Sequence, residues 1–283
     1  MRLPRTKCWL FSSTLGRTLG VVKGVGSPVA LLVACIGSSA CGEPDTGGLP
    51  DLVTPPVPEE TSVDYALVFE SDPQYATTAN AYFPVAKVSQ SITAWVKPLR
   101  LDVEEVFFTM RRGTESGTSF GFSQGRLTAW SVWGMRIFAQ ASSSITLDRW
   151  YHVAHVQTLI DDADDVYEQR LYLDGVLVAE GAQPPASRTP TSSWLGSFDG
   201  SSQQYAGQLD DLRLYARVLS EAEVAAEAAR DPVSTEGLVA FWSFDEAPGT
   251  SVAYDRSGNG NHATLGDGVE ALMPGRVPSD ADF

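Results

Sequence analysis

A loop in the C-terminal part of the chain carries the side chains best suited to bind a metal ion. Asp255, Asn259 and Asn261 lie close together, with Gly258 and Gly260 between them. Calcium takes about six to eight oxygen ligands from carboxylates, side-chain amides and backbone carbonyls, and a glycine-rich backbone can turn its carbonyls inward. The loop therefore predicts a calcium site. A plain Asn-Gly turn, held by its own hydrogen bonds, is the alternative.

Two tryptophans, Trp130 and Trp133, offer a second kind of chemistry. Aromatic faces bind the apolar faces of sugar rings, so these side chains are candidates for stacking on a ligand. They are three residues apart in a predicted strand, where successive side chains point to opposite faces. Only one of them can therefore face a given groove, and burial in the core is the alternative that we prefer.

No catalytic residue is predicted. His152 and His155 are also three apart on a predicted strand, so they project to opposite faces and cannot share a zinc ion. Only His262 remains as a third histidine, which gives little support to a Ser-His-Asp triad. The acidic run at residues 161–165 is best explained as an exposed charged loop.

Residues 1–41 differ from the rest of the chain. They contain five lysines and arginines and no acidic residue, although the formal net charge of the whole chain is −15. A basic stretch leads into an apolar run at residues 29–36 and then into small residues, which is the layout of a secretory signal peptide. A cysteine after small residues resembles the lipobox of bacterial lipoproteins. Cys41, directly before a linker, is our preferred lipidation site, and Cys35 is the alternative.

Residues 42–62 contain five prolines and few apolar side chains, so they predict an extended linker. The acidic balance of the remaining chain argues against nucleic acid as a partner. No stretch reaches the ~18–20 apolar residues needed to span a bilayer. We therefore expect an exported bacterial protein at the cell envelope, on the outer membrane or cell surface, which touches the membrane only through a lipid anchor.

From residue 63 onward, short apolar runs alternate with turn residues. Asp174-Gly175 lies between two such runs, and this pair is a strong hairpin signal. Strands at this regular spacing, with little helix, predict an all-β fold of two antiparallel sheets packed as a sandwich. One short helix is expected near residues 220–230, where Ser220 and Glu223 can form a capping box.

Four segments of the chain resemble, in the family's order, the laminin-G-like, concanavalin A-like jelly-roll family. The resemblance covers residues 63–232 and implies a jelly-roll sandwich. Glucanases of this architecture place two glutamates around an aspartate on one strand. Residues 207–215 (GQLDDLRLY) hold no glutamate, so the protein is not predicted to be an enzyme. The four segments are residues 91–98 (SITAWVKP), 149–154 (RWYHVA), 171–178 (LYLDGVLV) and 205–220 (YAGQLDDLRLYARVLS).

The C-terminal part matches the family out of order. Residues 237–246 (GLVAFWSFDE) resemble the family's usual first strand, and residues 255–264 (DRSGNGNHAT) resemble the loop that follows it. A second domain is one explanation, but about 46 residues are too few for another sandwich. We prefer the alternative, in which residues 237–265 supply that strand and calcium loop to a single domain at 63–283, because domain termini often lie close together.

The resemblance also implies that the loop binds a structural calcium ion together with Asp210. The adjacent Asp211 is a further candidate ligand. Hydrogen bonds from these aspartates to loop amides are the alternative. The resulting prediction is a surface-tethered binding or adhesion module that recognises carbohydrate or protein outside the cell. Two alternatives are a structural or assembly domain of the cell envelope and, less favoured, a glycoside-acting enzyme. The ligand itself cannot be named from the sequence.

Overall fold

The computed structural model describes residues 57–70, 73–78, 89–112, 116–132, 136–161, 166–183 and 191–280. The chain divides into two units, residues 1–53 and residues 54–283, and all described residues belong to the second. The predicted signal peptide, both candidate lipidation cysteines and most of the linker lie outside the described residues. Among the helices that are described, none has the length and apolar character needed to cross a membrane.

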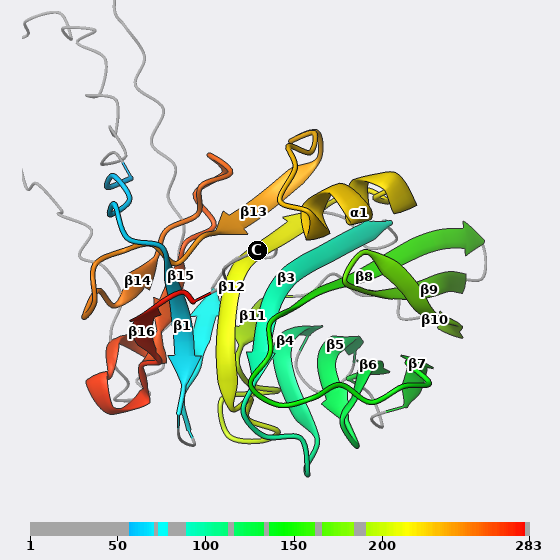
Figure 1. Cartoon of the computed structure of the whole chain (residues 1–283), viewed down its shortest axis with the longest axis horizontal. Coiled ribbons are helices and arrows are strands. Elements are labelled where there is room, and N and C mark those ends of the chain that lie inside the picture. The colour runs from blue at the N-terminus through cyan, green and yellow to red at the C-terminus, as the bar shows by residue number, and fades with distance from the viewer. Residues whose placement is uncertain are drawn as a thin grey trace, which may run out of the picture. The chain divides into compact units, whose positions relative to one another are not determined.

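The described residues form two antiparallel sheets of eight strands each, as the period-two pattern predicted (Figure 1). The first sheet has the order β10 (Val176–Gln183), β9 (Val166–Leu173), β8 (Tyr151–Asp161), β3 (Gln90–Pro98), β12 (Gly207–Tyr215), β1 (Tyr65–Phe69) and β16 (Gly275–Pro278), with β13 (Leu238–Trp242) also paired to β12. The second has the order β14 (Val252–Ala253), β15 (Ala263–Leu265), β2 (Ala76–Thr78), β11 (Ser192–Leu195), β4 (Glu105–Arg112), β5 (Ser116–Ser123), β6 (Arg126–Ser131) and β7 (Ile137–Gln140). Two short 3₁₀ turns, η2 (Gly266–Gly268) and η3 (Glu270–Leu272), precede β16.

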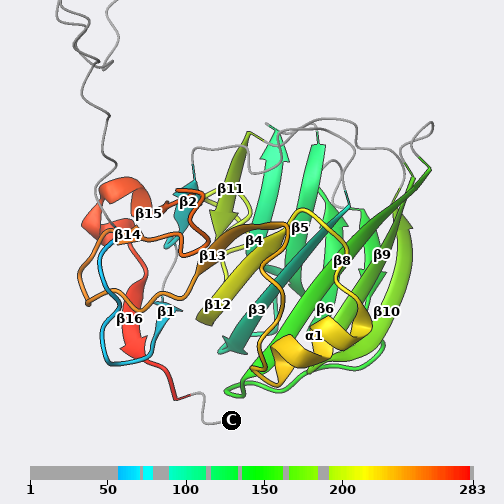
Figure 2. The same ribbon diagram turned by 90° about the horizontal axis from the view of Figure 1, so that it is seen from above.

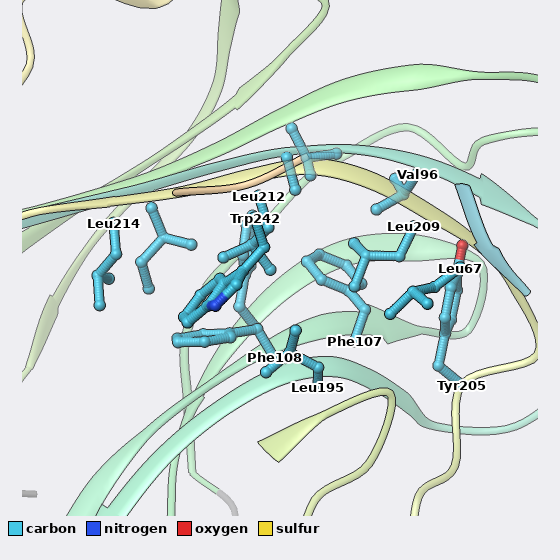
Figure 3. Close-up of a cluster of buried hydrophobic side chains, with 14 of the residues drawn as sticks. Leu67, Val96, Phe107, Phe108, Leu195, Tyr205, Leu209, Leu212, Leu214 and Trp242 are labelled. Carbon is cyan, nitrogen blue, oxygen red and sulfur yellow. The ribbon is translucent and has the colours of Figure 1, made fainter. Parts of the chain in front are cut away.

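The hydrophobic core fills the space between the sheets. Figure 3 shows Leu209, Leu212 and Leu214 of β12 in this core with the rings of Phe107 and Phe108. Leu209 and Leu212 are three residues apart, a spacing that would send them to opposite faces of a regular strand. The register of β12 against β3 shifts between Asp210 and Arg213, and such a bulge returns the later residues to the core side.

The C-terminal segment completes both sheets of this sandwich. β13 pairs with β12, β15 with β2, and β16 with β1, so that the red β16 lies beside the blue β1 in Figure 1. Trp242 and Phe244 are fully buried in the core, whereas the neighbouring Phe241 is only partly buried. Residues 238–278 are thus part of one sandwich and do not form a separate domain.

A buried ion pair holds this segment in place. The Arg276 Nη2 atom of β16 lies 2.9 Å from Glu246 Oε2, and the two side chains are 1% and 3% exposed. The same guanidinium donates to the backbone carbonyls of Phe244 (3.0 Å), Thr250 (2.7 Å) and Val252 (3.0 Å). Arg276 therefore bonds to four acceptors at the end of the core.

The helix α1 (Glu221–Ala228) lies on the outer face of the first sheet, the face turned away from the second sheet (Figure 2). The predicted capping box is confirmed, because the Ser220 hydroxyl accepts from the Glu223 backbone N–H and the Glu223 carboxylate accepts from the Ser220 N–H. The predicted hairpin turn meets α1 at Gly175. A Cβ atom there would lie 3.1 Å from the Ala225 Cα atom, and Gly175 has φ = 78°, so both contact and conformation favour glycine.

Candidate functional site

Asp255 organises the loop that the sequence analysis proposed for calcium. Its side chain is buried, and both carboxylate oxygens accept backbone N–H groups. Oδ1 accepts from Phe241 (3.0 Å) and Ser257 (2.8 Å), and Oδ2 accepts from Asn261 (2.9 Å). These bonds tie the loop to β13 and are those of a side-chain-capped turn.

The two asparagines of the loop turn their amide nitrogens toward the protein. Asn259 Nδ2 donates to the carbonyls of Leu238 (2.9 Å) and Val239 (3.1 Å), and Asn261 Nδ2 donates to Val239 (2.8 Å). Carbonyl oxygens only accept hydrogen bonds, so the nitrogen end of each amide must face them. These contacts fasten the loop to the start of β13 without any metal ligand.

Asp210 and Asp211 lie at the bulge of β12 and share Arg230 as a partner, at 3.7 Å and 3.3 Å. Asp210 is 1% exposed; its carboxylate accepts from the Asp211 N–H (2.8 Å) and the Ser279 hydroxyl (3.2 Å). Burial, together with the negative charges of Asp211 and Asp64, raises the pKa of Asp210 to about 8. Asp211 pairs with guanidiniums, at 3.3 Å from Arg230 and 3.5 Å from Arg213.

Of the five predicted calcium ligands, three are aspartates and two are asparagines. Within the part of the chain that the structure describes, no group of three or more His, Cys, Asp or Glu side chains could hold a metal ion. The loop shows the hydrogen bonds that the Asn-Gly turn, the alternative, requires. Calcium binding by the protein stays a prediction to be tested in solution. The proposed ligands were Asp210, Asp211, Asp255, Asn259 and Asn261.

The calcium prediction implies a higher melting temperature with excess calcium than with a chelator. A ligand that binds only the folded state at 100 times its Kd would stabilise it by about 2.7 kcal/mol, which a thermal melt resolves easily. Magnesium in place of calcium is the matched control for ionic strength. Equal melting temperatures with calcium and with a chelator would contradict the calcium site and leave the hydrogen-bonded turn.

Of the two tryptophans proposed to stack on a ligand, the structure describes Trp130. Trp130 is 0% exposed, and its neighbours across the sheet are Ser119 of β5 and Ile137 of β7. A ring without accessible surface cannot stack on a ligand, so Trp130 takes the buried position that was the alternative. Trp133 lies outside the described residues.

His152 and His155 have different surroundings in the structure. His152 packs edge-on against Trp95 at 5.4 Å, whereas His155 contacts Phe120 in the core and bonds to Gln169. The two histidines therefore lie on opposite faces of β8, as their spacing predicted. Burial lowers the pKa of both, that of His152 to about 3 and that of His155 to about 4.

Glu105 is fully buried, whereas its neighbour Glu104 bonds to Gln203 at the surface. Burial raises the pKa of Glu105 to about 7, although the Arg100 guanidinium at 2.6 Å acts against this shift. The two carboxyl groups thus occupy different environments and do not face each other across a common space.

A cluster of aromatic and charged side chains lies on the outer face of the second sheet. Leu195 and Met110 point into the core, so the adjacent Trp194 and Arg111 project from the opposite face. The Arg111 guanidinium lies 5.1 Å from the centre of the Trp194 ring and 5.0 Å from the centre of the Phe198 ring. It is therefore held by two cation–π contacts.

Asp199 completes this cluster, which we call the Trp194 site (Trp194, Arg111, Phe198 and Asp199). Asp199 Oδ2 lies 3.8 Å from Arg111 Nη1, and its Oδ1 accepts from the backbone N–H groups of Ser201 (3.0 Å) and Ser202 (2.9 Å). Although burial opposes it, hydrogen bonds from the two serines lower the pKa of Asp199 below its usual value. The side chains of Arg111 and Asp199 are 11% and 28% exposed, and Trp194 is partly exposed.

The loop after β11 fixes the geometry of the Trp194 site. The Ser197 hydroxyl accepts from the Gly200 N–H (2.8 Å), and Phe198 N–H donates to the Ser202 carbonyl (3.1 Å). A Cβ atom at Gly200 would lie 3.5 Å from the Trp194 indole nitrogen, so the loop packs directly against the ring. The site thus offers an aromatic surface, guanidinium donors and carboxylate acceptors in fixed positions.

The fold and this arrangement define a lectin-like jelly roll. The family model for the concanavalin A-like lectin/glucanases superfamily matches residues 70–225, which is more than half of the chain. The chain belongs to this superfamily. No curated protein matches the chain.

Solved structures of other proteins share the fold at low sequence identity. A Bacteroides ovatus protein, named as a proposed carbohydrate-binding protein, has a TM-score of 0.56 at 15% identity and covers 79% of this chain; the chain spans 62% of that protein. Domain 4 of an extracellular arabinanase from Geobacillus stearothermophilus, in complex with arabinotriose, has a TM-score of 0.46 at 21% identity. The match covers 58% of this chain and 76% of that domain. The CBM40 of the Ruminococcus gnavus IT-sialidase has a TM-score of 0.43 at 14% identity. The match covers 58% of this chain and 97% of the CBM40.

Proposed function

We propose that this chain is a non-catalytic binding module whose ligand is carbohydrate and whose contact surface is the Trp194 site. The observation that carries the proposal is the partly exposed Trp194 ring beside the Arg111–Asp199 pair, in a chain of the lectin/glucanase superfamily. The name of the Bacteroides ovatus protein supports the same class of ligand. Fold alone does not determine function, so the proposal depends on these side chains.

The Trp194 site has the chemistry that sugar recognition needs. The indole face can cover the apolar C–H face of a pyranose ring, while Arg111 donates and Asp199 accepts hydrogen bonds at its edge. Both charged groups are largely buried and already oriented, so little side-chain entropy is lost when a ligand binds. Display outside the cell is a further part of the proposal. It is supported by the signal-like residues 1–41 and by Cys41, with Cys35 as the alternative.

A glycan array probed with the purified full chain tests this function. We expect a set of glycans to bind the natural protein and Trp194→Ala to weaken that binding at least about tenfold, equivalent to about 1.4 kcal/mol. Trp150→Ala is the matched control, because Trp150 is also partly exposed and its indole bonds instead to Asp280. Circular dichroism confirms that both variants fold.

Three outcomes would contradict the proposal. Equal binding by Trp194→Ala and the natural protein would mean that the ligand contacts another surface. A complete absence of glycan binding would favour the structural or assembly role in the envelope. Release of reducing ends from polysaccharides by the natural protein would show that the chain is an enzyme.

A further inference from the structure

A cavity of about 410 Å³ lies on the outer face of the first sheet, on the opposite side of the sandwich from the Trp194 site. Its volume is within the range of about 300–1,000 Å³ that is usual for small-molecule sites. β12 and β13 provide its floor, and the end of α1 with the following residues 230–235 provides its wall. Figure 2 shows α1 over the first sheet, to which β13 belongs.

The floor of the cavity is a guanidinium group in a fixed orientation. Arg213 lies 4.1 Å above the centre of the Phe241 ring. Its Nη1 atom lies 2.9 Å from Glu227, and its Nη2 atom lies 3.5 Å from Asp211. The stacked ring fixes the plane of the group, and the two carboxylates fix its rotation. The side chain is still 23% exposed, so a ligand can reach it.

Tyr215 and Arg230, which also line the cavity, are each held by a carboxylate. The Tyr215 hydroxyl donates to Glu227 Oε1 at 2.6 Å, and the Arg230 guanidinium lies 3.3 Å from Asp211. Glu227 is buried, with a side-chain exposure of 5%. Each guanidinium thus faces a carboxylate across the cavity wall, and Pro232, Val233 and Leu238 supply apolar surface between these groups.

The charges of the cavity determine which ligands it favours. Its two guanidiniums are paired with carboxylates, and a third carboxylate, Asp231, is exposed, so an ion pair between it and a cationic ligand adds little. A charged ligand would have to displace one member of an existing ion pair and leave a partly buried charge without its partner, which is costly. A neutral ligand with several hydroxyl groups can accept hydrogen bonds from the guanidiniums and donate to the carboxylates while the pairs stay formed. Its apolar C–H face can rest on the side chains of Val233 and Leu238.

We propose that this cavity, bounded by β12, β13 and the end of α1, is a second binding site that takes one neutral sugar residue. The proposal does not depend on the Trp194 site, because the two surfaces share no residue. The alternative is a purely structural role for the Arg213–Glu227–Asp211 network, in which its ion pairs only fasten α1 to the first sheet. A substitution that fills the cavity and leaves the network intact distinguishes the two roles, because it blocks only the binding of a ligand.

The experiment measures binding of D-glucose, D-galactose and D-mannose to the full chain by calorimetry, with D-glucosamine and D-galacturonic acid as charged comparators. Trp194→Ala isolates the second site. In that background Val233→Trp places an indole in the cavity and leaves Arg213, Glu227 and Tyr215 unchanged. We expect it to weaken binding of the preferred neutral sugar at least about tenfold. Val176→Trp, at a 65% exposed position of β10, is the matched control.

Three results would overturn the second site. Binding lost entirely in Trp194→Ala would place the only sugar site on the second sheet, and would support the proposed function while removing this one. Equal binding with and without Val233→Trp would exclude the cavity. Tighter binding of either charged sugar would contradict the argument from charge balance. If Val233→Trp does not fold, Thr235→Tyr fills the same cavity from an exposed position.

Discussion

Replacement of Arg276 by methionine is expected to lower the free energy of unfolding by about 3–5 kcal/mol, the usual cost of removing one partner of a buried ion pair. Glu246 would keep its charge at 3% side-chain exposure and would lose the nearer of its two guanidinium partners, keeping only Arg256 at 3.5 Å. The carbonyls of Phe244, Thr250 and Val252 would lose a donor as well. Urea unfolding monitored by tryptophan fluorescence measures the change.

Arg149→Met is the matched control for this prediction. Arg149 also pairs with a carboxylate, at 3.2 Å from Asp174, but the two side chains are 62% and 41% exposed. Exposed pairs are worth about 0–1 kcal/mol, so this variant should unfold close to the natural protein. In a double variant, Glu246→Leu should recover part of the loss caused by Arg276→Met, because no charge then remains buried. Equal, small effects of Arg276→Met and Arg149→Met would contradict the burial of the Arg276–Glu246 pair.

Trp242→Ala is expected to cost about 3–5 kcal/mol, as large-to-small substitutions of buried aromatic residues do. Trp242 is 0% exposed, and Figure 3 shows its ring among Phe108, Leu212 and Leu195. The indole nitrogen also donates to the Asn261 carbonyl at 3.0 Å, so the variant additionally weakens the Asp255 loop. Thermal and urea unfolding of the purified chain give the change.

The neighbouring Phe241→Ala provides the comparison, because its side chain points to the outer face of β13 and is only partly buried. Its contact with Arg213 is of a kind worth about 0.5–1 kcal/mol at exposed sites, so the expected loss is much smaller. If the two substitutions had equal effects, or if Trp242→Ala were harmless, the C-terminal segment could not be part of the core as described.

Features of the fold that depend on neighbouring residues could be predicted from the sequence. The Asp174-Gly175 hairpin and the Ser220–Glu223 capping box are local, and both appear where expected. The two-sheet sandwich followed from alternation within strands together with a resemblance that covers residues 63–232. The pairing of β13 with β12 was harder to foresee, because two arrangements fit the same motif and only a long-range contact separates them.

The candidate site was less predictable, because it depends on residues distant in sequence. Trp194 and Arg111 meet across the β11–β4 pair, and nothing near either residue indicates the other. Trp130 has the residue type of a sugar-binding side chain, but its burial depends on what packs over it. For Asp255 the residue type also fits a metal ligand, whereas the structure shows its oxygens accepting backbone N–H groups. Backbone N–H groups and a metal ion compete for the lone pairs of the same carboxylate oxygens.

The pairing of β16 with β1 and of β13 with β12 also affects how the protein folds during its synthesis. β1 and β12 acquire these partners only after the ribosome has made much more of the chain, so a nascent chain that ends before Leu238 lacks Trp242, Phe244 and Arg276. Folds dominated by such distant pairings close slowly, in about milliseconds to seconds. The nascent chain should therefore stay sensitive to proteases until β16 is made and then become resistant in one cooperative step.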